Sequence, residues 1–560
     1  MLNSTKKMLV GIAVSAALAL GACETGPTSE DPSAQVLVDT SREPMATGKF
    51  EPTWESLKQY ECPEWFRDVK FGIWAHWGPQ CQPEQGDWYA RLMYPAETPQ
   101  GRFHREHYGH PSIFGFKDVI HEWKAQNWDP DRLVALYKRV GAQYFFAMAN
   151  HHDNFDLWDS PYQPWNSVNM GPEKNIIEGW ARAARAQDLP FGVSLHAAHA
   201  WTWYETSRGS DKEGPKAGVP YDGTLTQADG KGEWWEGYDP QDLYAQDHPL
   251  SQGSDDLRRL HSQWNWDNGA SVPDRAYCEK FYNRTVDLIN RYQPDLVYFD
   301  DTGLPLYPIS DAGLRIAAHL YNSSASRNQG ENQAVLFGKV LTEEQRNCLT
   351  WDVERGVCND IQPHPWQTDT CLGTWHYNIH VYEQNGYKSA KTVIHMLVDI
   401  VSKNGNLLLN VPVRGDGTID DKEERILEGI AAWMEVNREC IFDTRPWKIF
   451  GEGPAQAEVA EIQAQGFNEG RGKEPTAQDI RFTTKDGVLY AIAMGWPTEP
   501  LSIKALGTRS TTADRPIAQI DVLGSQEPVH WTQAEEALLI QPLKDKVCDE
   551  TAVFRITFEQ

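Results

Sequence analysis

Short apolar stretches alternate with amphipathic stretches along the chain from about residue 51 to residue 450. The apolar stretches predict strands at 70–76, 143–150, 190–196, 295–300, 335–340, 348–354 and 406–411. The stretches with a helical period predict helices at 130–139, 174–187, 275–292, 391–403 and 422–437. This alternation predicts a parallel sheet, most simply a (β/α)₈-type TIM barrel. A doubly wound sheet is the alternative, but no G-x-G-x-x-G or G-K-[ST] loop follows a predicted strand.

The pattern changes after Trp447. Short alternating strands broken by turns are predicted at 480–482, 487–494, 517–522, 537–540 and 552–558. They indicate a small antiparallel β-sandwich. We therefore expect a catalytic barrel over residues 51–450 and a β-sandwich domain over 451–560. A long polar insertion at 201–273 follows a predicted strand, and we expect it to form a loop over the active face.

The N-terminus resembles an export signal. A basic pair precedes an apolar run over residues 8–22, which is too short to cross a bilayer. The run ends in Leu-Gly-Ala-Cys at Cys23, similar to a bacterial lipobox, with ordinary signal cleavage as the alternative. We expect a lipoprotein signal peptide over 1–23, with Cys23 as the lipid anchor, and a flexible linker over 24–50. The protein would then be an exported bacterial lipoprotein of the periplasm or the outer membrane and cell surface, with the N-terminal lipid as its one membrane contact.

Composition narrows the possible partners. The net charge of −27 and the pI near 5 argue against nucleic acid, which requires basic patches. The chain has 23 Trp, 21 Tyr and 19 Phe, which suit either an aromatic core or flat platforms for sugar rings. The nine cysteines contain no C-x-x-C pair, so zinc-ribbon and thioredoxin-type motifs are excluded. Their pairing and the oligomeric state of the protein stay open.

The strand that ends at Asp300 carries the strongest chemical signal. In the segment RYQPDLVYFDDTG, residues 296–300 predict a buried strand, and Leu296, Tyr298 and Asp300 share one of its faces. Carboxylates at the carboxyl ends of parallel barrel strands lie where chemistry is done. We therefore predict Asp300 as the nucleophile of a retaining glycosidase. The alternative is an aspartate that caps the next helix, a role that Asp301 can take instead.

A retaining glycosidase needs a second carboxyl group about 5 Å from the nucleophile. Glu354 ends another predicted strand, 54 residues after Asp300 and about two βα units further around the barrel. We predict it as the general acid and base. Asp352 and Glu331 are the reserve candidates, and an ion pair between Glu354 and Arg355, or another arginine on the rim, is the structural alternative.

Histidines end three of the predicted strands. These histidines are His76, the pair His151 and His152, and His196. Neutral imidazoles suit sugar hydroxyls, because each offers one donor and one acceptor. A zinc site is the alternative, and it predicts inhibition by chelators. Asp87 and Trp88 in the loop after the first strand, and Trp375 later, add a carboxylate and stacking rings.

These segments resemble glycoside hydrolase family 29, the α-L-fucosidases, over about residues 53–450. The resemblance is carried by WFRDVKFGIWAHWGPQCQPEQGDWYARLMY, YFFAMANHHDNFDLWDS, PDLVYFDD and WDVERG. It implies a retaining exo-acting α-L-fucosidase that needs no cofactor and no metal and acts on fucosylated oligosaccharides or polysaccharides. Asp300 would attack C1 of a terminal α-L-fucose, while Glu354 would protonate the leaving oxygen and later activate water.

The resemblance also implies which residues bind the sugar. They are His76, Asp87, Trp88, His151, His152, His196 and Trp375. The chain departs from the family in two of them, since Asp87 replaces a usual Glu and His196 replaces a frequent Tyr. The departure at His196 leaves another L-sugar, such as an α-L-galactoside, as an alternative substrate. A glycan-binding surface lipoprotein without catalysis is a further alternative.

Overall fold

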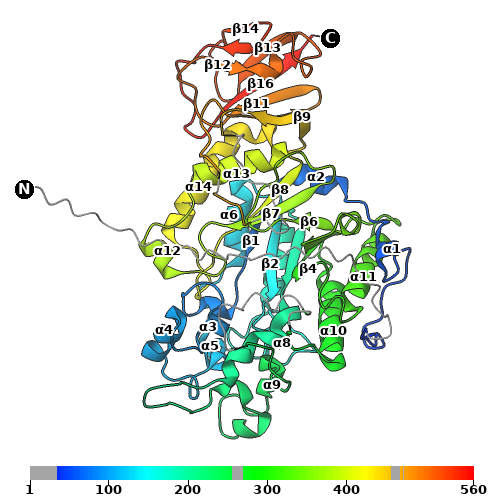
Figure 1. Ribbon diagram of the computed structural model, residues 1–560, viewed down its shortest axis with the longest axis vertical. Coiled ribbons are helices and arrows are strands. Elements are labelled where there is room, and N and C mark those ends of the chain that lie inside the picture. Colours follow the sequence, from blue (N-terminus) through cyan, green and yellow to red (C-terminus); the bar gives the residue numbers. More distant parts are fainter. Residues whose placement is uncertain (1–34, 255–265, 267–268, 456–466, 471, 560) are drawn as a thin grey trace, which may run out of the picture. The chain divides into compact units, whose positions relative to one another are not determined.

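The computed structural model describes residues 35–254, 266, 269–455, 467–470 and 472–559. Its largest part is a closed barrel in which eight parallel strands pair in chain order, β1 to β8 (Figure 1). The strands are β1 Phe71–Ala75, β2 Tyr144–Asn150, β3 Phe191–Leu195, β4 Leu296–Thr302, β5 Val335–Lys339, β6 Thr350–Asp352, β7 Trp366–Cys371 and β8 Gly405–Asn410. The predicted TIM barrel is confirmed.

Helices cover the outside of the barrel (Figure 1). The longest are α6 Pro130–Val140, α7 Ile176–Ala186, α10 Arg275–Tyr292, α11 Ala312–Arg327, α13 Ala390–Ser402 and α14 Asp421–Asn437. α6 shows why they begin and end where they do. Asp129 accepts the backbone N–H of Arg132 at 3.0 Å and Pro130 opens the helix, while Gly141 closes it at φ 114°.

Seven of the eight barrel strands were predicted, and β7 was not. Its sequence, WQTDTC, is polar, yet all six residues are buried. The reason is that the barrel interior is polar at this level. Tyr298 donates to Asp369 at 2.9 Å, and Gln367 donates to Asp352 at 2.9 Å. Polar side chains that satisfy one another inside a barrel remove the apolar signal by which a strand is recognised.

The C-terminal region forms two antiparallel sheets, as predicted. The strands are β9 Arg445–Glu452, β10 Ile480–Lys485, β11 Val488–Ala493, β12 Leu501–Ile503, β13 Ile517–Val522, β14 Trp531–Gln533, β15 Leu538–Ile540 and β16 Ala552–Phe558. One sheet has the order β13-β16-β11-β10-β9 and the other β12-β15-β14. The larger sheet is tied to α13 by an ion pair between Arg481 Nε and Asp399 Oδ1 at 2.6 Å.

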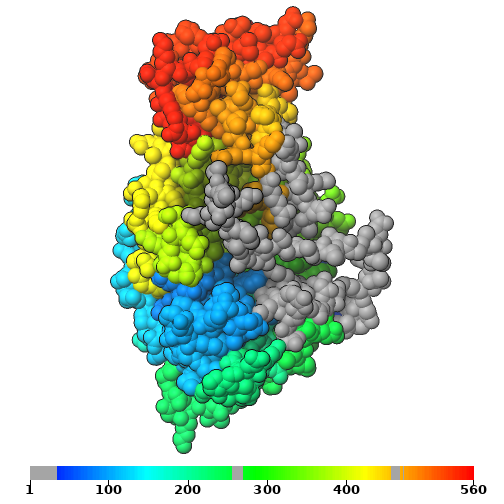
Figure 2. Space-filling model, turned by 60° about the vertical axis from the view of Figure 1, so that its left-hand side comes forward, coloured from blue at the N-terminus to red at the C-terminus, as the bar shows by residue number. Residues whose placement is uncertain are grey.

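The segment after β3 begins with η3 Ala197–His199 and α8 Ala200–Trp203, and the insertion predicted at 201–273 follows from within α8 and contains α9 Pro240–Tyr244. It packs against the segment after β1 that carries α3 Tyr89–Leu92, α4 Pro99–His107 and α5 Phe116–Glu122. Figure 2 shows the two segments lying directly against each other, the earlier one in blue and the insertion in green. Arg91 donates to the carbonyl of Thr202, and Tyr94 donates to Asp222. Both segments follow strand ends, so they build one side of the active face.

The N-terminal predictions and the open question of the cysteines remain. The signal peptide and Cys23 lie outside the described residues, so the lipid anchor stays a prediction. None of the described helices combines the length and the apolar character that a bilayer crossing requires. All eight cysteines within the described part of the chain are free thiols.

Candidate active site

The predicted site residues of the barrel gather at the carboxyl ends of its strands. His76 follows β1, His151 and His152 follow β2, His196 follows β3, Asp300 lies in β4, Glu354 follows β6, and Trp375 follows β7. Two asparagines hold these ends in place. Asn410 at the end of β8 accepts the backbone N–H of His76 at 2.9 Å, and Asn150 at the end of β2 accepts that of His196 at 3.1 Å.

Lys339, the last residue of β5, joins the two predicted catalytic carboxyl groups. Its Nζ lies 2.8 Å from Asp300 Oδ1 and 2.6 Å from Glu354 Oε2. The two oxygens are therefore separated by at most the sum of these distances, about 5.4 Å. Retaining glycosidases place their carboxyl groups about 5–5.5 Å apart, whereas inverting enzymes leave about 6.5–9.5 Å for a water molecule. The geometry of this pair fits the retaining class.

Asp300 is held as a carboxylate. His152 Nε2 and His196 Nδ1 both lie 3.2 Å from its Oδ2, and Lys339 occupies Oδ1. Burial alone would raise the pKa of Asp300, but the Lys339 ammonium and the two histidines hold that pKa well below its usual range. The side chain is still 22% exposed, so it is open to the cavity. An ionised carboxylate facing a cavity is the form that a nucleophile requires.

Glu354 has the opposite protonation tendency. Burial raises its pKa to about 7 against the lowering effect of Lys339, and the charges of Asp369 and Asp300 add to the rise. The alternative role, an ion pair with Arg355, is not found. Arg355 Nη2 instead lies 3.5 Å from Glu469 Oε1. A carboxyl group with a pKa near neutral pH is suited to give up a proton and take it back.

The reserve carboxyl groups do not reach the cavity. Asp352 is 1% exposed inside the barrel, where burial and the neighbouring Asp369 raise its pKa well above the usual range. Glu331 is exposed and precedes β5, at the amino-terminal end of the strands. Because the predicted site lies at the carboxyl ends, Glu331 is on the opposite side of the barrel.

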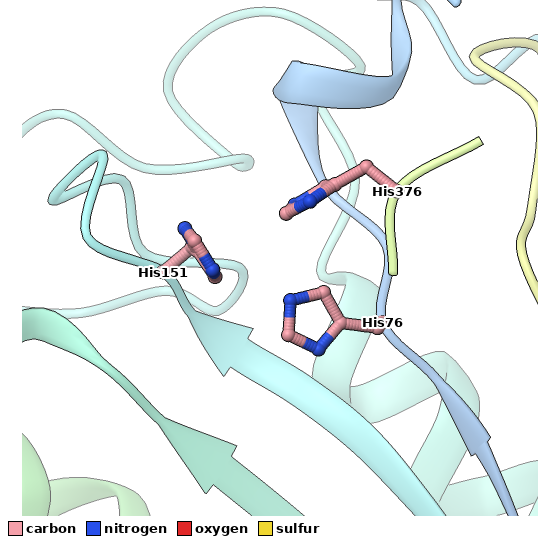
Figure 3. Close-up of side chains that lie close together, drawn as sticks. All are labelled: His76, His151 and His376. Carbon is pink, nitrogen blue, oxygen red and sulfur yellow. The ribbon is translucent and has the colours of Figure 1, made fainter. Parts of the chain in front are cut away.

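Three histidines from different segments face one another above the strand ends (Figure 3). The ring centres of His76, His151 and His376 lie 4.7–5.0 Å apart. Neither ring nitrogen of His76 has a hydrogen-bond partner among the described residues, and His376 Nδ1 has only a long contact of 3.5 Å with Asp87 Oδ1. Burial and the neighbouring histidines lower the pKa of His76 and of His151 well below the usual value, so both are neutral. Buried polar nitrogens without a protein partner indicate a ligand site.

The rest of this pocket combines rings and a carboxylate. Trp375 packs against Trp74 at 5.6 Å between ring centres, and Trp88 meets Trp203 of the insertion at the same distance. Asp87 Oδ1 accepts the backbone N–H of His376 at 2.7 Å. The arrangement offers apolar faces and hydroxyl partners within one cavity, as a sugar requires.

His196 differs from the other histidines. Its Nδ1 faces Asp300, and its Nε2 lies 3.1 Å from Ser194 Oγ. Both ring nitrogens therefore contact the protein. The structure shows His196 as a direct support of Asp300, and its role as a sugar contact stays a prediction.

Two groups of three histidines have the spacing of a metal site. They are His76, His151 and His376, and His151, His152 and His196, with ligand atoms within 4.8 Å of one another. In the second group, His196 already uses both nitrogens, so a metal ion would displace existing hydrogen bonds. In the first group, neutral imidazoles suit a transition metal as well as hydroxyl groups.

A sequence model of the alpha-L-fucosidase family matches residues 37–439, well over half of the chain. The chain belongs to the alpha-L-fucosidase family. A second model, for the alpha-L-fucosidase C-terminal domain, matches residues 473–557. The resemblance proposed from the sequence is thus confirmed, and so is the prediction of a glycoside hydrolase.

Curated α-L-fucosidases match along most of their length. The human plasma enzyme is 24% identical over 506 residues, and the rat tissue enzyme is 23% identical over 504 residues; each match covers 87% of both proteins. Among solved structures, the Thermotoga maritima α-fucosidase with a mechanism-based inhibitor has a TM-score of 0.64 at 22% identity, covering 91% of this chain and 100% of that one. The Paenibacillus thiaminolyticus α-L-fucosidase isoenzyme 1 gives 0.59 at 19% identity, covering 89% and 98%. These structures share the fold of this α-L-fucosidase family member.

Two residues of the site were not predicted. Lys339 ends a strand that was predicted, and a lysine at the end of an otherwise apolar strand was the available signal. His376 follows Trp375, which was predicted, but β7 itself was missed. Without that strand, no strand end marked His376, and only the predicted contact of Trp375 pointed to this loop.

Proposed function

We propose that this member of the alpha-L-fucosidase family is a retaining, exo-acting α-L-fucosidase with Asp300 and Glu354 as its catalytic pair. One observation carries the proposal. Lys339 Nζ contacts both carboxyl groups and so limits their separation to the range of retaining enzymes. The opposite pKa shifts of the two groups support the division of roles.

In the first step, Asp300 attacks C1 of a terminal α-L-fucose. Its Oδ2 is oriented by His152 and His196, so the carboxylate is positioned before the sugar arrives. Glu354 donates its proton to the glycosidic oxygen as the C1–O bond breaks, and the leaving alcohol departs neutral. The product is a fucosyl ester of Asp300.

In the second step, water enters from the side that the alcohol has left. Glu354, now ionised, takes a proton from this water as the oxygen attacks C1 and the ester bond to Asp300 breaks. Two inversions at C1 release L-fucose in the α configuration and return both carboxyl groups to their first states. No cofactor takes part in either step.

The sugar is assigned from the pocket and from the family. The two ring nitrogens of His76 and the Nε2 of His376, which have no hydrogen-bond partner among the described residues, suit hydroxyl groups, and Trp375 offers an apolar face. The related Thermotoga maritima enzyme has been solved in complex with fucose. An α-L-galactoside is the second candidate, because it differs from the fucoside only by a hydroxyl on C6, and because His196 replaces a tyrosine that is frequent in the family.

The experiment is a panel of p-nitrophenyl glycosides followed by proton NMR. We expect hydrolysis of the α-L-fucoside with α-L-fucose as the first anomer observed, and a much smaller kcat/KM for the α-L-galactoside. First appearance of the β anomer would contradict the retaining mechanism. Preference for the galactoside would contradict the substrate assignment, and hydrolysis of neither would favour a glycan-binding protein.

Export as a lipoprotein is a separate part of the proposal. It is supported by the apolar run over residues 8–22 and its Leu-Gly-Ala-Cys ending at Cys23. Such a protein would act on glycans at the cell surface or in the periplasm. Mass spectrometry of the mature N-terminus after expression in a bacterial host tests it: we expect a lipid-modified Cys23, and a free N-terminus at another residue would contradict the anchor.

A further inference from the structure

A short segment far along the chain contacts the loop that carries Glu354. Residues 467–470, here called the clamp segment, come after the barrel and before strand β10 in the sequence. The backbone N–H of Phe467 donates to the carbonyl of Glu354 at 3.0 Å, and that of Glu469 donates to the carbonyl of Arg355 at 3.0 Å. Asn468 Oδ1 accepts the N–H of Val357 at 2.9 Å, and its Nδ2 donates to the Val357 carbonyl at 3.2 Å. Three consecutive residues of the clamp segment therefore contact the Glu354 loop.

The side chain of Glu469 fastens this segment to the barrel. Its Oε1 lies 2.7 Å from Lys388 Nζ and 3.5 Å from Arg355 Nη2, and Thr370 Oγ1 donates to its other oxygen. Only 14% of the side chain is exposed. Burial alone would raise the pKa of Glu469, but Lys388, Thr370 and Arg355 lower it, so the group is ionised. An ionised, nearly buried glutamate with three partners holds its backbone segment in one position.

The loop that carries Glu354 needs contacts of this kind to keep its conformation. Strand β6 ends at Asp352, so Glu354 lies beyond the barrel ladder. Arg355 adopts φ 44°, in the left-handed region that residues with a Cβ rarely occupy. A backbone of this kind persists when the surrounding contacts over-determine it. On one side β7 bonds the loop: the Asp369 carbonyl accepts the Arg355 N–H at 2.8 Å, and Thr368 Oγ1 donates to the Gly356 carbonyl at 2.7 Å. On the other side the clamp segment bonds the carbonyls of Glu354 and Arg355.

The clamp segment lies in neither stretch matched by the family. The barrel match ends at residue 439, and the C-terminal match begins at residue 473. The contacts with Glu354 therefore come from a part of the chain that family membership does not account for.

We propose that Glu469 is a positioning residue for Glu354, acting through the clamp segment to hold the acid and base of the reaction in place. The inference rests on the proposed function, because it requires that Glu354 transfers the proton. It predicts an effect confined to proton transfer. Asp300 lies in β4 and is held by residues at the ends of β2, β3 and β5, and none of the described residues of the clamp segment contacts it.

The test compares two fucosides in the full-length protein carrying Glu469→Gln. Methyl α-L-fucoside has a poor leaving group and depends on the acid, whereas an aryl fucoside with a strongly acidic phenol departs without help. We expect kcat/KM for the methyl fucoside to fall about 10- to 100-fold, the size that a small misplacement of a catalytic group produces. For the activated aryl fucoside we expect a change of less than about threefold.

Two further variants make the result decisive. Glu439→Gln is the matched control, because Glu439 also links the barrel to the C-terminal sheets, bonding Tyr490 at 2.5 Å and Arg555 at 3.1 Å, without contacting the Glu354 loop. For Glu439→Gln, kcat/KM for both fucosides should stay near that of the unmodified protein. Asn468→Ala removes the bonds to Val357 and leaves the Glu469 ion pairs intact. We expect it to lower kcat/KM for the methyl fucoside more than for the aryl fucoside, by a smaller factor than Glu469→Gln. This variant keeps the test valid even if Glu469→Gln lowers the melting temperature.

Equal losses on both substrates in Glu469→Gln and Asn468→Ala, or no loss in either variant, would overturn the positioning role. Glu354→Ala, measured alongside, separates this failure from a failure of the proposed function. If Glu354→Ala shows the split between substrates and the Glu469 and Asn468 variants do not, only the positioning role is wrong. If Glu354→Ala shows no split, Glu354 is not the acid and both proposals fall.

Discussion

The two sides of the cavity hold their carboxyl groups in different ways. Asp300 lies within β4, and its contacts come from nearby strand ends, His152 after β2, His196 after β3 and Lys339 at the end of β5. Glu354 lies past the end of β6, in a loop with a left-handed residue and bonds to the clamp segment 467–470. The nucleophile side is thus set by barrel register, and the acid side by a loop and a distant segment. Changes on the two sides should therefore have different signatures.

The largest effect is expected from Asp300→Gly. Removing the nucleophile should lower kcat/KM about 10⁴-fold or more for every fucoside, because no substrate avoids the attack on C1. Added azide can occupy the vacated space and attack from the same face, and it should yield the β-L-fucosyl azide. Near-normal turnover in a correctly folded variant would remove Asp300 from the mechanism.

Glu354→Ala should lower kcat/KM by an amount that depends on the leaving group of the substrate. We expect a loss of about 10²- to 10⁴-fold for fucosides with poor leaving groups and a much smaller loss for activated aryl fucosides. Azide should now replace the attacking water and give the α-L-fucosyl azide, the anomer opposite to that from Asp300→Gly. Identification of the two azides by NMR tells the two sides of the cavity apart, and the same anomer from both variants would contradict the assignment.

Lys339→Met tests the one group that the two sides share. The ammonium favours the ionised form of both carboxyl groups, so its removal should raise the pKa of Asp300 and of Glu354. Both limbs of the pH profile should move to higher pH, and the maximum should fall about 10- to 100-fold. Lys339→Arg keeps the charge and should leave the limbs close to their original positions. Movement of one limb alone would show that Lys339 serves only one carboxyl group.

The pH profile of the unmodified enzyme gives a smaller, graded effect. Glu354, with a pKa of about 7, is protonated below that pH and loses its proton as the pH rises through it. kcat/KM for a poor leaving group should therefore fall about tenfold for each pH unit above about 7. Asp300 has a pKa well below its usual range, so it stays ionised in mild acid. Glu354→Gln should lack the alkaline limb, and a limb that remains would belong to another group.

The smallest effect is expected from metal removal. If His76, His151 and His376 bind sugar hydroxyls, dialysis against EDTA should leave kcat/KM within about twofold of its original value. Loss of activity that added zinc restores would favour the metal interpretation of these histidines.

The nucleophile side was predictable from sequence because strand ends are local patterns. A buried strand that ends in a carboxylate, as at Asp300, and strand ends with histidines, as at His76 and His151, place residues without knowledge of distant contacts. Even there one detail differs, since β4 continues two residues past Asp300 to Thr302.

The acid side was only partly predictable. Glu354 was predicted. Strand β7 was not, because its side chains face the polar barrel interior around Asp369, and His376 in the loop after β7 was therefore not predicted either. The contact between Glu354 and residues 467–470 joins positions more than a hundred residues apart. Such a pairing depends on how the C-terminal region packs, and no periodic pattern in the sequence records it.

The position of Lys339 between two acids has a consequence for the timing of the reaction. Asp300 loses its negative charge when it becomes an ester, and Glu354 gains one in the same step, so the lysine faces a single anion of the pair in both halves of the cycle. Since the charge of Asp300 is one of the causes of the high pKa of Glu354, esterification also lowers that pKa. The same glutamate is thereby converted from proton donor to proton acceptor by the chemistry at its neighbour, without a movement of the backbone.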